Sequence, residues 1–194
     1  ADMLRKSPLD AAAGEAAAVE NLGSELAVCY GLALSPDGSQ VLRGAGGVKL
    51  VNLHGPGGRW LVTETVPWDF THVALAFDRS GRRAAVGTSF SRPPARKLLR
   101  VFDLPGATLR HEWPLVPPGE ADTPFGWNAT RMAFAPDGRL LVGGIGGIRR
   151  FDVETGANEW LWRVPDTLMV LMAANADGRR IAAVVSVADS KGLP

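Results

Sequence analysis

The chain has 194 residues, with 21 Lys and Arg against 20 Asp and Glu, which gives a formal net charge of +1. So small a net charge produces no overall field that recruits nucleic acid or an anionic membrane, and neither is expected as a partner. The single cysteine, Cys29, excludes an internal disulfide. No apolar run reaches the length of a membrane span and no signal peptide is visible, which leaves the compartment open with the cytoplasm favoured.

Residues 1–27 are predicted to be a linker. Residues 8–20 are rich in alanine and contain acidic side chains, a composition that fits a short helix. Few large apolar side chains are available there for docking, so we expect a lightly packed lead-in to the rest of the chain.

A repeat dominates residues 28–194. Each copy carries a glycine, here called the anchor glycine, with an alanine five residues before it. The anchor glycines are Gly38, Gly81, Gly138 and Gly178, and the alanines are Ala33, Ala76, Ala133 and Ala173. A repeat of this kind has to be recognised first, because it decides how every motif inside it is interpreted.

Within each repeat, short apolar runs alternate with turn residues. The first and third repeats match without a gap from the anchor glycine to Trp60 and Trp160. The second repeat matches once an insertion at residues 89–96 is allowed, and the fourth stops after its second apolar run. Asp-Gly and Gly-Gly between apolar runs indicate hairpins, because glycine accepts the positive φ of tight turns. The runs themselves are too short for helices.

These patterns predict an all-β fold made of β-propeller blades, each with four antiparallel strands. We expect blades at about residues 28–66, 70–115 and 128–164, and a partial blade at 168–194. A closed propeller needs roughly four to eight blades, so an incomplete propeller or a fragment of a larger one is expected. Its open edges would be completed by further blades of the same chain or of another chain.

The repeats resemble those of the bacterial WD-repeat family. The segments at residues 34–38 (Leu-Ser-Pro-Asp-Gly) and 134–138 (Phe-Ala-Pro-Asp-Gly) are similar to the first half of its pattern, and Phe102-Asp103-Leu104 and Phe151-Asp152-Val153 to the second. The resemblance covers roughly residues 28–188. The Trp-Asp pair of this sequence, Trp68-Asp69, lies in the connection between the first two blades and not within a repeat, so the buried hydrogen-bond network of the eukaryotic members is not implied. Quinoprotein and lactonase-type propellers share the same outline.

No catalytic or metal-binding motif stands out from the repeat. Gly44, Gly46 and Gly47 precede Lys49, but a strand follows them where a phosphate-binding loop needs Ser or Thr at a helix start. His54, His72 and His111 do not stand at metal-ligand spacing from another His or Cys, and no Gly-x-Ser-x-Gly motif is present. We therefore expect neither a metal nor another cofactor, and no enzyme activity from this segment.

Several residue types inside the repeat are assigned structural roles. The aspartates beside the anchor glycines are expected to accept hydrogen bonds from backbone N–H groups of their own turns. The tryptophans on the fourth strands are expected to pack between blades: Trp60, Trp113 and Trp160. The paired arginines are expected to be solvated strand ends: Arg82-Arg83, Arg149-Arg150 and Arg179-Arg180.

Three irregular segments remain as candidates for binding. They are the insertion at 89–96 and the connections between blades at 67–70 and 116–128, and aromatic and arginine side chains in such loops are typical of binding sites. The candidate binding residues are Trp68, Arg92, Arg96, Phe125 and Trp127. Because all three segments join strands at the same end of the blades, we expect them to gather on one face, opposite the anchor turns. Such a surface suits a peptide or an acidic protein segment.

The function predicted from the sequence is that of a non-catalytic, WD-repeat-like propeller segment, which serves as a protein-interaction or sensing scaffold in a larger bacterial protein. The alternative is part of a propeller enzyme, lactonase-like or quinoprotein-like, whose catalytic residues lie outside this segment.

Overall fold

The computed structural model describes residues 31–44, 47–55, 57–63, 70–90, 97–104, 106–116, 129–164, 167–175 and 179–187. These residues form strands and turns, and the predicted all-β fold is confirmed. Within this part of the chain, no helix is long and apolar enough to cross a membrane. The predicted linker and short helix lie outside the described residues.

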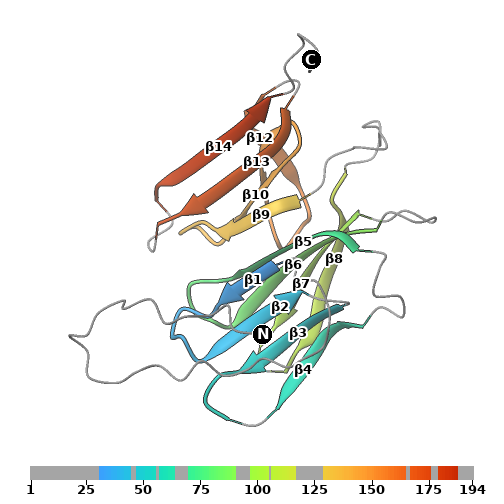
Figure 1. Cartoon of the computed structure of the whole chain (residues 1–194), viewed down its shortest axis with the longest axis vertical. Helices are drawn as coiled ribbons and strands as arrows, with labels where there is room; N and C mark the ends of the chain where they lie inside the picture. The colour runs from blue at the N-terminus through green and yellow to red at the C-terminus, as the bar shows by residue number, and fades with distance from the viewer. Residues whose placement is uncertain are drawn as a thin grey trace, which may run out of the picture.

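Three antiparallel sheets each contain four strands in chain order, and a two-stranded sheet follows (Figure 1). The first sheet is β1 (Gly31–Leu34), β2 (Gln40–Gly44), β3 (Gly47–Asn52) and β4 (Gly58–Thr63). The second is β5 (Phe70–Phe77), β6 (Arg83–Phe90), β7 (Lys97–Asp103) and β8 (Thr108–Pro114). The third is β9 (Ala129–Phe134), β10 (Leu140–Gly144), β11 (Gly147–Phe151) and β12 (Asn158–Arg163). The fourth is β13 (Thr167–Ala174) and β14 (Ile181–Val187).

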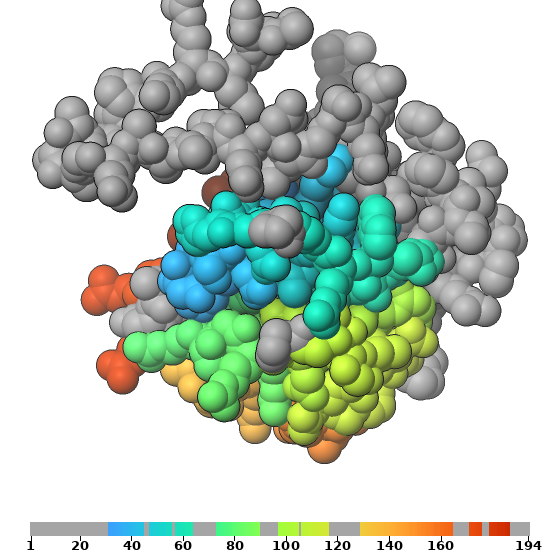
Figure 2. All heavy atoms as spheres, turned by 90° about the horizontal axis from the view of Figure 1, so that it is seen from below, coloured from blue at the N-terminus to red at the C-terminus, as the bar shows by residue number. Residues whose placement is uncertain are grey.

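The sheets are stacked face against face with their first strands β1, β5, β9 and β13 side by side. Each repeated alanine lies in one of these first strands, as predicted: Ala33, Ala76, Ala133 and Ala173. Figure 2 shows the blue and cyan atoms of the first sheet lying against the green and yellow-green atoms of the second. Stacked four-stranded sheets with adjacent first strands are the blades of a β-propeller, here an incomplete one.

The core of the molecule lies between successive sheets. Buried side chains of the first sheet, such as Leu42, pack with Phe102 of the second, and Leu99 of the second packs with Phe151 of the third. A smaller cluster joins the third sheet to Met172 of the fourth. Burial of apolar area contributes roughly 25 cal/mol per Å², so the contacts between sheets are the main stabilising interactions of this fold.

The turns between first and second strands fall at the anchor glycines. The N–H of Gly38 donates to the carbonyl of Ser35 at 2.9 Å, and Gly81 and Gly138 make the same bond at 3.0 Å to Asp78 and Ala135. All three glycines have a positive φ, which is why glycine stands there. The fourth predicted turn, at Asp177-Gly178, lies outside the described residues.

The first and third repeats match in sequence without a gap, but their second strands are paired differently with the first strands. Ala33 lies opposite Leu42, whereas Ala133 lies opposite Leu141 instead of the residue one place later. In the first sheet the Oγ of Ser35 accepts a bond from the N–H of Gln40 at 2.8 Å, which stabilises a longer turn. Alanine at position 135 has no such acceptor, and the shorter turn moves β10 by one residue.

Candidate functional site

A groove of about 520 Å³ runs across the first strands of the sheets, at the end where the anchor turns lie. All four sheets contribute to it. Its apolar lining comes from the ends of the first strands and from the turn prolines: Leu34, Phe77, Met132, Phe134, Pro36 and Pro136. Leu34, Phe77 and Phe134 each stand four residues before an anchor glycine. The repeat itself therefore places an apolar side chain at the same point in three successive sheets.

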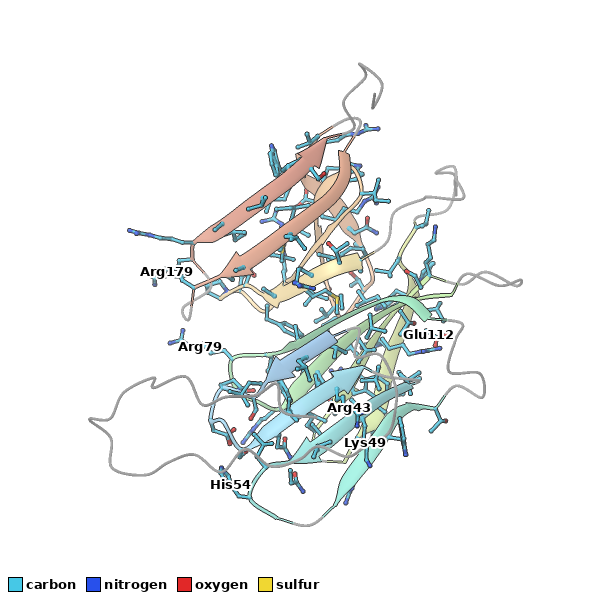
Figure 3. All side chains as sticks on the ribbon, in the orientation of Figure 1. Arg43, Lys49, His54, Arg79, Glu112 and Arg179 are labelled. Carbon is cyan, nitrogen blue, oxygen red and sulfur yellow. The ribbon has the colours of Figure 1, made fainter. Side chains whose placement is uncertain are left out.

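Polar groups at the edge of this groove are mostly engaged in their own turns. The side chain of Asp78, which lines the groove, accepts the N–H of Arg83 at 3.0 Å and the hydroxyl of Ser80 at 2.7 Å. Asn175 on the fourth sheet accepts the N–H of Arg180 at 2.9 Å in the same way. Arg79 also lines the groove and is exposed. Figure 3 labels Arg79 and Arg179 on the same side of the molecule, in the segments that join β5 to β6 and β13 to β14.

The turn aspartates hold the anchor turns in shape, as the sequence predicted. The Asp37 carboxylate accepts bonds from the hydroxyl of Ser35 at 2.6 Å and from the N–H of Ser39 at 3.0 Å, which lower its pKa to about 2. Asp137 accepts the N–H of Arg139 at 3.0 Å. These bonds stabilise the ionised carboxylates locally, so this role is structural.

A second hollow, of about 410 Å³, lies at the opposite end of the first strands. Leu32, Leu75 and Arg131 are among the residues that line it. The exposed Arg131 donates from Nη1 to the carbonyl of Thr130 at 2.9 Å. This hollow is close to the strand ends from which the irregular segments of the sequence depart.

A cluster of charges joins the second sheet to the third. Glu154, in the turn between β11 and β12, lies 2.8 Å from Arg83, 3.0 Å from Arg110 and 3.4 Å from Nε2 of His111. The bond from Arg110, followed in weight by that from His111, lowers the pKa of Glu154 against the opposing effect of burial. Asp103 pairs with the same two arginines, at 3.7 and 3.2 Å. The cluster is balanced in charge and partly exposed, and its chemistry is that of an ion-pair network between sheets.

A smaller pocket of about 220 Å³ lies on the third sheet, at the end where the anchor turn of that sheet lies. It is lined by Arg139, Arg150, Asp152, Asn158 and Glu159. Arg150 forms an ion pair with Glu159, which lowers the pKa of that carboxyl. The N–H groups of Thr155 and Glu154 lower the pKa of Asp152. With both signs present and paired, the pocket does not select an ion of one charge.

One buried cation was not anticipated from the sequence. Arg149 is 2 % exposed, although its position in an arginine pair suggested a solvated strand end. Its guanidinium lies 4.1 Å from the centre of the Trp160 ring, and Nη1 donates to Oδ1 of Asn158 at 2.7 Å. Trp160 and Trp113 pack against the core between the second and third sheets, as predicted. Trp60 does not pack between sheets. No described sheet covers its face of the first sheet, and its side chain is 44% exposed.

The five candidate binding residues from the sequence all lie outside the described residues: Trp68, Arg92, Arg96, Phe125 and Trp127. The strand ends that flank their segments are described. They are Thr63 and Phe70, Phe90 and Lys97, and Pro114 and Ala129. By strand direction these ends lie opposite the anchor turns, so the common face for the five residues stays a prediction. The groove at the anchor turns was missed, although the regular spacing of Leu34, Phe77 and Phe134 was available as a signal.

No protein-family model matches the sequence, and no curated protein matches it significantly. The fold is similar to that of a TolB-like protein from Agrobacterium tumefaciens, with a TM-score of 0.59 and 15% identity over 87% of this chain and 59% of that one. It is similar to the dihydro-heme d1 dehydrogenase NirN, with a TM-score of 0.56 and 19% identity over 85% of this chain and 36% of that one. It is also similar to the WD40 repeats of RRP9, with a TM-score of 0.55 and 15% identity over 77% of this chain and 42% of that one.

These similarities show a partial β-propeller of the kind found in TolB-like and WD40 proteins, as the resemblance of the repeats implied. The chain spans 36% to 59% of the length of the three structures. An enzyme and a set of WD40 repeats are both among them, so the shared fold does not choose between catalysis and binding.

Proposed function

We propose that this β-propeller segment is a non-catalytic scaffold that binds a protein segment in the groove at the anchor turns. The carrying observation is that all four sheets contribute to one groove with apolar walls and an arginine at its edge. Leu34, which is 60% exposed, supplies accessible apolar area there. Apolar anchors surrounded by a few polar groups are typical of surfaces that bind protein chains.

The partner that fits is an extended segment with apolar side chains and a carboxylate. The apolar side chains would lie along Phe77, Phe134 and the turn prolines, and the carboxylate would approach Arg79. Because Asp78 is already bonded within its own turn, it competes little for that arginine. A polypeptide of this kind is the protein partner that we propose for the chain. The loops that carry Arg92 and Trp127 are proposed as additional contacts at the other end.

Completion by further strands is proposed at the fourth sheet. In the described part of the chain, β14 pairs with β13 alone and so presents a sheet edge. On the outer face of this sheet Val184 is 70% exposed and Leu171 is 36% exposed. Exposed edges and apolar faces of this kind favour pairing with other strands. Blades of the same chain or of another chain would supply them.

The groove is tested by selecting peptides on the immobilised full chain from a random displayed library and measuring their affinity by calorimetry. We expect acidic–apolar peptides to be enriched, and Arg79→Glu or the double variant P36S/P136S to weaken them about tenfold, ~1.4 kcal/mol. The matched control is Leu109→Ser on β8, where the side chain is 49% exposed but lies away from the groove. Equal affinity for the groove variants and the control would rule the groove out as the site.

A further inference from the structure

The second hollow, at the end of the first strands opposite the anchor turns, is lined by three sheets. Its volume of about 410 Å³ lies in the range of sites that bind small molecules. The strand β5 lies between β1 and β9 (Figure 1) and supplies the buried part of the lining, namely Val73, Ala74 and Leu75. Leu32 of β1, which is 61% exposed, and the exposed Arg131 of β9 line the hollow from either side of β5. An apolar floor thus lies between a leucine and a cation.

Arg131 departs from the repeat at its position. It stands seven residues before its anchor glycine, where the other repeats have Gly31, Ala74 and Leu171. Gly31 and Ala74 line the same hollow, so equivalent positions of three successive sheets meet there. A Cβ on Gly31 would lie 2.7 Å from the carbonyl oxygen of Val73, which shows how little room the neighbouring first strands leave. The repeat therefore gives no structural reason for an arginine, and such departures are expected at functional sites.

The guanidinium of Arg131 is held in position by one hydrogen bond and makes no ion pair within the described part of the chain. Its Nη1 donates to the carbonyl of Thr130 at 2.9 Å. Thr130 is fixed in turn, because its buried Oγ1 donates to the carbonyl of Gly143 at 3.1 Å. The remaining N–H donors of the guanidinium lie in one plane, an arrangement that matches the two oxygens of a carboxylate. Arg131 is thus an oriented cation with donors available for a ligand.

The charge and polarity of the lining restrict the ligand. Of the described residues that line the hollow, Arg131 alone carries a charge, so one negative charge is the number that it balances. The other lining side chains are apolar except for Thr130, whose hydroxyl is already bonded. Such a surface favours a hydrocarbon chain over a second polar group, because apolar area removed from water stabilises the complex.

We propose that the second hollow binds a small aliphatic monocarboxylate. The carboxylate binds Arg131, and the hydrocarbon chain lies over Leu75 and against Leu32. This ligand is distinct from the polypeptide proposed for the groove, and it binds at the other end of the first strands.

Titration of the full chain with sodium hexanoate tests the proposal by nuclear magnetic resonance. The signals followed are those of the Arg131 Nε–H and of the backbone N–H of Leu75, and we expect both to shift and to saturate. In the series acetate, butanoate and hexanoate, each added methylene should tighten binding about threefold, because it buries more apolar area. Hexanamide has the same chain without the charge and should bind about tenfold more weakly than hexanoate.

Two variants separate the charge from the apolar contact. Arg131→Gln should weaken the binding of hexanoate about tenfold. Leu32→Ser should weaken it about threefold and leave acetate unaffected, because acetate has no chain to bury. The matched control is Arg82→Gln, which removes an exposed arginine from the opposite end of the second sheet and should change nothing. Circular dichroism and the melting temperature confirm that each variant is folded.

Several results would overturn the proposal. One is the absence of saturation in the unchanged chain, whether or not E120Q/D122Q restores it; restoration would identify a carboxylate of the chain itself as the occupant. Another is an equal response to Arg131→Gln and Arg82→Gln. A third is tighter binding of inorganic phosphate than of hexanoate, because the apolar floor would then contribute nothing. The peptide-binding test of the groove uses different ligands and different variants, so the two proposals fail independently.

Discussion

In the first sheet and in the third, four residues lie opposite one another across the four strands and form a row on one face. The rows are Leu32, Arg43, Lys49 and Trp60 in the first sheet, and Met132, Val142, Arg149 and Trp160 in the third. The two rows differ in what surrounds them. Met132 is 8% exposed and its counterpart Leu32 is 61% exposed. The cation in the third sheet, Arg149, is 2 % exposed and lies 4.1 Å from its tryptophan ring, whereas Lys49 lies 5.5 Å from an exposed one. The second sheet covers this face of the third sheet, and no described sheet covers the same face of the first. Burial at a repeat position is thus decided by the neighbouring blade and not by the strand.

The largest expected effect is at the first position of the row. Met132→Ala removes a buried side chain from between two sheets and leaves a cavity, and we expect it to lower the free energy of unfolding by about 3 kcal/mol. Leu32→Ala, at the exposed counterpart, should cost less than about 1 kcal/mol. Urea unfolding of the full chain measures both. Equal losses would mean that the two rows are buried to the same extent.

The fold was predictable because its signals are local and repeated. The anchor glycines, the alanines five residues before them and the Asp-Gly turns recur at fixed spacing, and each is a requirement of a turn or of the crowded first strands. The hydrogen bonds of the turn aspartates followed from the same local chemistry. Such features need no knowledge of which sheet lies next to which.

Other features depend on contacts between distant residues and were not predictable. Arg149 and Lys49 stand at equivalent places in the repeat, yet one is buried and the other half-buried. The one-residue displacement of β10 depends on whether position 135 can accept a hydrogen bond, a detail hidden by a gapless alignment. The groove at the anchor turns combines residues from four sheets. No single motif contains it.

The turns between third and fourth strands also differ between the first sheet and the third. A Cβ on Gly156 would lie 2.5 Å from the Trp113 ring of the second sheet, and this glycine has φ +74°. Gly57 in the first sheet has φ +99° and nothing within 4 Å of such a Cβ. Gly156→Ala therefore combines backbone strain with overpacking, and we expect it to cost about 3 kcal/mol. Gly57→Ala should cost only the strain, about 1 kcal/mol. Thermal unfolding checks this difference, and similar losses would argue against close packing of the second and third sheets at Trp113.

Lys49 of the first sheet and Arg149 of the third also differ in how far their contacts with tryptophan rings are desolvated. A cation over an aromatic ring stabilises by about 2 kcal/mol when it is desolvated and by about 0.5 to 1 kcal/mol when it is exposed. Arg149→Gln should therefore lower the free energy of unfolding by about 2 kcal/mol, and Lys49→Gln by at most about 1 kcal/mol. Trp160→Leu in the Arg149→Gln background separates the pair in a double-mutant cycle. A coupling no larger than that between Lys49 and Trp60 would contradict a buried cation–ring contact.

The smallest effect is expected at the ion pairs between the second and third sheets. Glu154 is about half exposed, its side chain retaining 46% of its accessible area, so its pairs are worth at most about 1 kcal/mol. Arg110, His111 and Arg83 lower its pKa from the ordinary value of 4.5. The stabilisation is therefore present above pH 4.5 and is lost as the pH falls through the lower pKa of the folded state.

Glu154→Gln should remove this part of the acid sensitivity and cost up to about 1 kcal/mol at pH 7. His54 stands at the same repeat position in the first sheet, which has no preceding sheet among the described residues to supply such partners. His54→Gln should therefore leave the acid limb of the stability profile unchanged, and urea midpoints between pH 3 and pH 7 compare the two variants. If Glu154→Gln keeps the full acid sensitivity of the unchanged chain, the contact between the second and third sheets does not depend on this carboxylate, and apolar packing around Trp113 and Phe151 holds those sheets together without it.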